Sequence, residues 1–196
     1  MKKFGILLVI FSLFTSSFLS GRSEKFYFVE INTNKGVIVV KLFNETPLHR
    51  DNFVKLCKTK FYNEILFHRV IKNFVIQAGD PESKSHEKGI ELGEGDLKYK
   101  VLSEIIPGMY HRKGVLAAAR EGDSVNPERA SSSTHFYIAI GRVQTDEDLA
   151  KAQARINKAN KTNDFKFSDE VVQTYKTLGG IPHLDTQYTI FGEVVK

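Results

Sequence analysis

The residues best suited to chemistry are concentrated in the stretch FHRVIKNFVIQAGD, residues 67–80. It places His68 and Arg69 on one short apolar run and Gln77 on the next. Successive side chains of a strand point to opposite faces, so two paired runs could bring Arg69 and Gln77 to one face beside apolar groups. Such a face would offer a fixed positive charge and several hydrogen-bond donors. By residue type alone, however, a solvent-exposed arginine and glutamine is the commoner interpretation.

The sequence contains no motif typical of a metal-dependent or nucleophilic enzyme. No histidine belongs to an H-x-x-x-H or H-E-x-x-H pair, and Cys57, the only cysteine, has no partner for a disulfide or a zinc site. There is no G-x-S-x-G elbow and no phosphate-binding G-x-x-x-x-G-K-S/T, and residues 131–133 are interpreted as a polar loop. A metal-dependent hydrolase would require three of six histidines to converge: His49, His68, His86, His111, His135 and His183.

The elements that must position this stretch are mostly strands. Residues 26–31 and 37–43 are apolar-rich runs around the turn-forming NTNKG, which predicts a β-hairpin. Thr46 as N-cap and Pro47 at the first helical position predict a helix that ends near residues 58–60. Further short strands are predicted in ILFHRV, FVIQAG, GVLAAAR, HFYIAIG and YTIFGEVV, and a long surface loop over residues 80–98.

Residues 145–178 interrupt this β-rich pattern with two helices. The first opens at Thr145 with three acidic residues and spaces Leu149, Ala152 and Ile156 along one face. The second starts at Ser168 and stops at the Gly pair 179–180.

The start of the chain has the layout of a secretory signal. Two lysines precede an apolar run that is short for a membrane span, and small and polar residues follow it. We therefore expect a signal peptide over residues 1–23 and one globular domain over residues 24–196, exported to a periplasmic or extracellular space. A buried N-terminal helix and an uncleaved membrane anchor are the alternatives. The formal charge of +5 falls when the signal lysines are lost, and the remaining basic residues are too scattered to predict nucleic-acid binding.

The stretch resembles the cyclophilin signature F-H-R-x-x-x-x-F-x-x-Q-G-G-D, with Ala78 where the family usually has glycine. Supporting segments follow in the family's order: KGVLAAAR, SSSTHFYI and HLDTQYTIFGEV. The chain is thus similar to exported bacterial cyclophilin-type peptidyl-prolyl cis–trans isomerases. The resemblance implies a mainly β fold, a closed eight-stranded antiparallel barrel with capping helices. By the same resemblance, the helices of residues 145–178 would be an insertion. The family's last helix and strand would be expected after residue 196, so either the sequence is a fragment or its barrel closes differently, with an unpaired edge.

By position in the motif, the resemblance makes Arg69 the catalytic arginine, with Phe74 and Gln77 beside it. Phe74, Val75, Tyr137 and Leu184 line the proline pocket, and His68 belongs to the same motif. The backbone of Ala119 and Arg120 pairs with the peptide. His135 replaces a groove glutamine, His183 the tryptophan of cyclosporin-sensitive members, and Tyr188 their histidine.

The expected activity is therefore isomerisation of Xaa-Pro bonds in exported polypeptides. We expect a monomer without metal or cofactor, with weak cyclosporin binding and no stable membrane association unless the signal is uncleaved. The alternative is a proline-peptide-binding or chaperone module with little catalysis. The client proteins, the role of the insertion and the signal cleavage site are not determined by the sequence.

Overall fold

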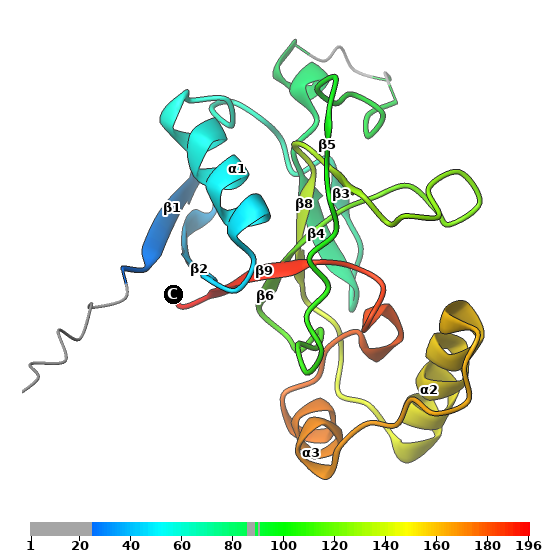
Figure 1. Ribbon diagram of the computed structural model, residues 1–196. Coiled ribbons are helices and arrows are strands. Elements are labelled where there is room, and N and C mark those ends of the chain that lie inside the picture. Colours follow the sequence, from blue (N-terminus) through cyan, green and yellow to red (C-terminus); the bar gives the residue numbers. More distant parts are fainter. Residues whose placement is uncertain (1–24, 86–88, 90) are drawn as a thin grey trace, which may run out of the picture.

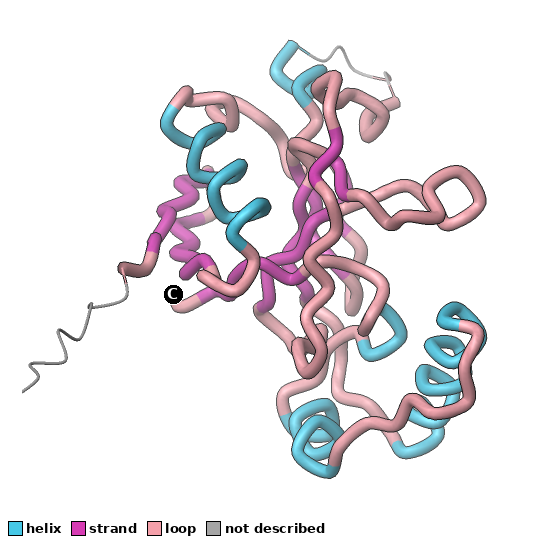
Figure 2. Tube along the Cα trace, in the orientation of Figure 1, coloured by secondary structure: helices cyan, strands magenta, loops and turns pink. Residues whose placement is uncertain are grey.

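The computed structural model describes residues 25–85, 89 and 91–196, so the expected signal peptide lies outside the described residues. The described part contains three α-helices and two sheets (Figures 1 and 2). The larger sheet has the strand order β1 (Tyr27–Thr33), β2 (Gly36–Leu42), β9 (Ile190–Val194), β6 (Val115–Ala118), β8 (Phe136–Ala139), β4 (Val75–Ala78) and β3 (Arg69–Val70). All its pairings are antiparallel, and the predicted β1–β2 hairpin is confirmed.

The closed eight-stranded barrel is not confirmed, because the sheet is open. β1 pairs with β2, β3 pairs with β4, and no ladder joins β1 to β3 among the described residues. β3 has only two residues, too few to support a long second ladder, and Tyr27 and Phe28 on β1 are exposed. A separate two-stranded sheet pairs β5 (Lys100–Val101) with β7 (Ser131–Ser132).

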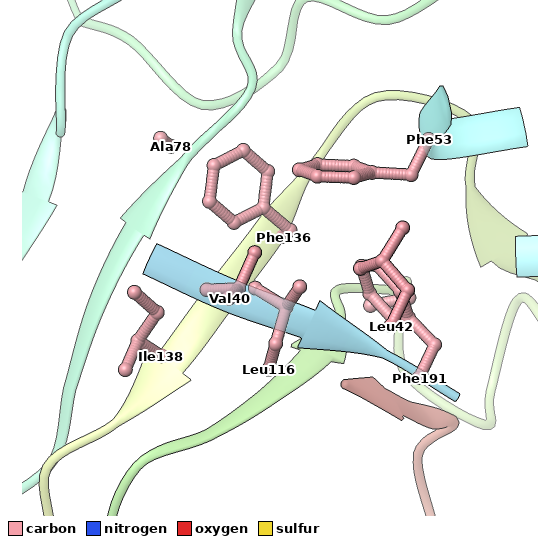
Figure 3. Packing of buried hydrophobic residues seen from close by; sticks show 9 residues of the cluster. Val40, Leu42, Phe53, Ala78, Leu116, Phe136, Ile138 and Phe191 are labelled. Carbon is pink, nitrogen blue, oxygen red and sulfur yellow. The ribbon is translucent and has the colours of Figure 1, made fainter. Parts of the chain in front are cut away.

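The core lies between the sheet and the helix α1 (Pro47–Lys58), and we call it the inner cluster. Strand alternation supplies it, since Phe136 and Ile138 of β8 point into it while Tyr137 between them does not. Phe53 of α1 meets Phe136 edge to face, with 5.2 Å between ring centroids (Figure 3). The buried members are Val40, Leu42, Phe53, Ala78, Leu116, Ala118, Phe136, Ile138 and Phe191.

Helix α1 begins and ends as predicted, but its N-terminus is capped differently. The Thr46 side chain makes no capping hydrogen bond. Instead the Glu104 carboxylate accepts the backbone N–H groups of Leu48 and His49, each at 3.0 Å. A carboxylate at this end satisfies free N–H groups and matches the positive end of the helix dipole. Glu104 also accepts from Nδ1 of His49 at 2.7 Å, and this bond holds the segment around Glu104 against the helix.

Both inserted helices are confirmed, α2 (Asp146–Asn160) and α3 (Asp169–Thr177). Thr145 and Asp148 form a reciprocal capping box on α2, and the Ser168 hydroxyl caps α3. The predicted apolar face of α2 is buried, and α2 packs beside the short 3₁₀-helix η2 (Pro182–Leu184). Both helices lie at the opposite end of the molecule from α1 (Figure 1).

Gly180 explains why the chain turns back sharply after α3. Its φ is +151°, and a Cβ there would lie 2.2 Å from the carbonyl oxygen of His111 and 2.7 Å from the Tyr175 ring. Only glycine allows two backbone segments to approach so closely. The segment that follows, which contains η2, is thereby held beside the sheet.

The expected loop of residues 80–98 is tied to the segment that precedes β8. It includes the 3₁₀-helix η1 (Pro81–Ser85). The Asp96 carboxylate accepts hydrogen bonds from the hydroxyls of Ser133 and Thr134 at 2.6 and 3.0 Å. These bonds hold the loop next to the end of β8.

Candidate active site

Four side chains form a row across the outer face of the sheet, opposite the inner cluster. Arg69 on β3 is the partner of Gln77 on β4, Gln77 of Tyr137 on β8, and Tyr137 of Ala117 on β6. Directly opposed residues of antiparallel strands project to the same face. The expectation that Arg69 and Gln77 share a face is therefore confirmed.

The Arg69 guanidinium is exposed but held in place by two contacts. Nη1 donates to Oε1 of Gln77 at 3.0 Å, and the guanidinium carbon lies 5.6 Å from the centroid of the Phe74 ring. Because a guanidinium has five N–H donors, the bond to Gln77 leaves others for a ligand. The site thus presents a positioned cation with free donors at the edge of an apolar surface.

This apolar surface is a second group of side chains, the outer cluster. Its buried members are Val75, Val115, Ala117, Tyr137, Ala139, Ile181 and Ile190. Half-buried Phe74, Leu184 and Tyr188 pack against it from the turn after β3 and from the segment around η2. The structure therefore brings together all four residues expected to surround the proline ring. Phe74 also stacks on His183, with centroids 6.0 Å apart and an interplanar angle of 8°.

A buried polar network beneath the outer cluster was not predicted. The Tyr137 hydroxyl lies 2.9 Å from Nε2 of His111, and Nδ1 of His111 lies 2.9 Å from the Asp185 carboxylate. The Tyr175 hydroxyl of α3 donates to the same carboxylate, with O–O distances of 2.8 and 2.9 Å. These members come from separate parts of the chain, so no local spacing could indicate the network. It connects the inserted helix α3 to the floor of the apolar surface.

The partners within this network determine which of its atoms carry hydrogen. An ionised carboxylate only accepts, so Nδ1 of His111 carries hydrogen and Nε2 accepts from the Tyr137 hydroxyl. Burial raises the pKa of the Tyr137 and Tyr175 hydroxyls well above the usual value, and for Tyr175 the nearby Asp185 charge adds to this. Both tyrosines therefore remain protonated donors. Since its hydroxyl faces His111, Tyr137 offers the groove an apolar ring.

The Arg120 side chain has a structural role that the sequence did not indicate. Only 4% of it is exposed. It donates to the carbonyl oxygen of Gln187 at 2.8 Å, pairs with Asp123 at 2.7 Å, and lies 4.7 Å from the centroid of the Tyr188 ring. Tyr188 in turn packs edge to face on Tyr137, with centroids 5.9 Å apart. Arg120 thereby holds the 187–188 segment at the rim of the outer cluster.

The backbone groups of Ala119 already have partners within the chain. Its N–H donates to the carbonyl of His135 at 3.0 Å, and its carbonyl accepts from the N–H of Ser132 at 2.9 Å. Of the two residues expected to pair with a peptide, Ala119 therefore contributes its backbone to the fold.

His68 and His135 lie together near the loop of residues 80–98. Their ring centroids are 5.4 Å apart, and Nε2 of His135 donates to the carbonyl of Gly95. Burial, followed by the neighbouring His135, lowers the pKa of His68 and favours its neutral form. These two predicted residues thus contact the loop.

The described residues contain no group of three His, Cys, Asp or Glu side chains that could hold a metal ion. None of the helices within the described residues is both long and apolar enough to cross a bilayer.

Burial raises the pKa of the Cys57 thiol to about 11, which disfavours the reactive thiolate.

The sequence is similar to a family model and to relatives of known assignment. Residues 28–196 match the sequence model of the family described as cyclophilin type peptidyl-prolyl cis-trans isomerase/CLD. A Staphylococcus aureus (strain COL) protein assigned as a peptidyl-prolyl cis–trans isomerase is 30% identical over 168 residues, 85% of this chain and 75% of the relative.

Solved structures agree on the fold. The crystal structure of a cyclophilin type peptidyl-prolyl cis–trans isomerase from Cryptosporidium parvum is 25% identical and superposes with a TM-score of 0.57, covering 88% of this chain and 79% of the other. The structure of that protein in the presence of the dipeptide Ala-Pro has a TM-score of 0.55 at 24% identity, covering 87% of this chain and 79% of the other.

Proposed function

The chain belongs to the cyclophilin-type peptidyl-prolyl cis–trans isomerase family, and on that basis we propose that its outer sheet face catalyses rotation about Xaa-Pro peptide bonds. The observation that carries the assignment to this face is the Arg69–Gln77 pair beside the outer cluster. The substrates are polypeptides that contain proline, the class represented by the Ala-Pro dipeptide used with the Cryptosporidium parvum relative.

The reaction requires no nucleophile because no covalent bond is made or broken. Rotation of a peptide bond has a barrier of about 18–20 kcal/mol, which comes from amide resonance. In the twisted transition state the proline nitrogen regains a lone pair and the carbonyl oxygen leaves the plane of the ring. A fixed donor that binds these atoms more strongly than it binds the planar amide lowers the barrier. Arg69 is the donor that the face presents, and Gln77 restricts its position.

The outer cluster supplies the other half of the reaction, which is to hold the ring still. Phe74, Val75, Tyr137 and Leu184 form an apolar surface for the pyrrolidine ring, so that rotation moves the preceding residue instead. Because both backbone groups of Ala119 are already bonded, we assign backbone pairing with the peptide to Arg120 alone. The buried Arg120 guanidinium then acts on the site by fixing the position of Tyr188.

A peptide assay with variants of one hairpin tests this assignment. The substrate is a short Ala-Pro peptide with a chromogenic C-terminal group, and circular dichroism checks the fold of each variant. We expect Arg69→Ala to lower kcat/KM at least about tenfold, since removal of one transition-state donor commonly costs more than that. Lys72→Ala, which removes one charge from the turn after β3, is the matched control and should retain activity. Equal activity of Arg69→Ala and wild type would refute the role of Arg69.

We also propose that the chain acts as an exported monomer that assists folding of exported proteins and binds cyclosporin weakly. The sequence of residues 1–23 supports export, and His183 in place of the family's tryptophan supports weak cyclosporin binding. Cell fractionation of the chain with and without residues 1–23 tests export. A cyclosporin titration of the activity tests the weak binding, and a sedimentation measurement tests the monomeric state.

A further inference from the structure

A cavity of about 250 Å³ lies beside the proposed proline pocket, between residues 73–74, residues 180–183 and the inserted helix α2. Phe74 and His183, which stack on each other at the pocket, line one side of it. Asp148, Lys151, Ala152 and Arg155 of α2 line the other. The insertion therefore extends the groove beyond the residues that contact proline.

The cavity wall carries three positive side chains, Arg142, Lys151 and Arg155, and one negative side chain, Asp148. Both oxygens of Asp148 accept from Arg142 at 2.8 Å, so these two charges largely neutralise each other. Lys151 pairs with Glu147 at 2.6 Å on the exposed side of the helix. Within the described part of the chain, Arg155 has no ion-pair partner. It is the charge in the wall that remains available.

The positive field of Arg155 reaches the pocket. After burial, its charge is the main cause that lowers the pKa of His183, which favours the neutral imidazole and leaves Arg155 as the cation at this point. Phe74 contacts both His183 and Arg69. A substrate whose proline lies at Phe74 is thus only one aromatic ring away from the cavity. An extended peptide spans about 3.3–3.6 Å per residue, so residues close to the proline can reach the wall.

We propose that this cavity binds a carboxylate side chain of the substrate, so that the chain favours Xaa-Pro sites with Asp or Glu within three residues of the proline. Arg155 is the specificity-determining residue. The inference rests on the proposed function of the outer face and names the class of peptide that it prefers.

Paired peptides test the preference without depending on catalysis alone. Six fluorescent peptides carry Glu at one of the three positions before or after the proline of an alanine-rich sequence, and six matched peptides carry Gln instead. Anisotropy measures binding, and the isomerisation assay measures kcat/KM. At one position or more we expect Glu to exceed Gln by roughly two- to fivefold, the range of a solvent-exposed ion pair. Salt at about 1 M should reduce the ratio towards one, because it screens exposed charges.

Substitutions in α2 then identify the residue that causes the preference for glutamate. Arg155→Ala should bring the Glu-to-Gln ratio close to one, and Arg155→Glu should invert it, while kcat/KM for the Gln peptides stays within about twofold of wild type. Lys158→Ala is the matched control, because Lys158 lies on the same helix but lines a separate hollow with Ala154 and Lys161. It should leave the ratio unchanged.

Two negative results have different meanings. A wild-type ratio of one at all six positions, or a ratio that survives Arg155→Ala, would overturn the proposed preference. Loss of isomerisation for every peptide while Glu peptides still bind more tightly would instead contradict the proposed catalysis and leave the carboxylate site supported.

Discussion

Replacing Tyr175 with phenylalanine removes one hydroxyl from a fully buried position and breaks the link between α3 and Asp185. The hydroxyl lies at hydrogen-bond distance from both carboxylate oxygens but has one proton, so one hydrogen bond is lost. A hydrogen bond to a charged group contributes about 1.5–3 kcal/mol to the free energy of unfolding. For a chain of this size each kcal/mol shifts Tm by about 2–4 °C, so we expect Tm to fall by about 3–12 °C.

Urea unfolding followed by circular dichroism measures this change directly. Tyr110→Phe is the matched control, because the Tyr110 ring packs on Tyr175 but its hydroxyl donates at 3.2 Å to the neutral Thr174 hydroxyl in a less buried place. That substitution should lower the free energy of unfolding by about 1 kcal/mol or less. If Tyr175→Phe were no more destabilising than Tyr110→Phe, the network would not contribute the stability inferred from its geometry.

Two further predictions concern a glycine and the histidines. Gly180→Ala should destabilise the fold by about 2 kcal/mol or more in urea unfolding, because its Cβ would overlap the His111 carbonyl, whereas Gly108→Ala, with open space around it, should cost about 1 kcal/mol. Burial lowers the pKa of His49, His68 and His183 in the folded chain. The unfolded chain then binds more protons below about pH 6.5, so the free energy of unfolding should fall between about pH 7 and pH 5.5, by at most about 1.4 kcal/mol per histidine and pH unit. Equal urea midpoints at the two pH values, with unchanged m-values, would contradict this.

Local patterns predicted most of the regular elements. The short apolar runs FVIQAG and HFYIAIG predicted β4 and β8, and the caps Thr145 and Ser168 predicted where α2 and α3 begin. These signals are carried by neighbouring residues, so a single sequence contains them. β5 and β7 have two residues each, too few to show a period. The strand expected in ILFHRV is confirmed only at its last two residues.

The features that were missed depend on contacts between distant segments. Thr46 had the residue type of a cap, yet Glu104 provides the cap from more than fifty positions away. Arg69, Gln77 and Phe74 could be found because one motif contains them. The roles of His111, Asp185 and Arg155 follow only from the way the fold brings β8, η2 and the inserted helices together.

The Glu104 cap also has a consequence for the order in which the chain acquires structure during synthesis. When residues 47–58 leave the ribosome, Glu104, whose carboxylate receives the first N–H groups of α1, has not yet emerged. The Ser131 hydroxyl that lies 2.9 Å from Nε2 of His49 is translated later still. Until Glu104 emerges, water must satisfy these N–H groups. Helix α1 is therefore made early, but the contacts at its N-terminus are completed only after residues 104 and 131 have emerged.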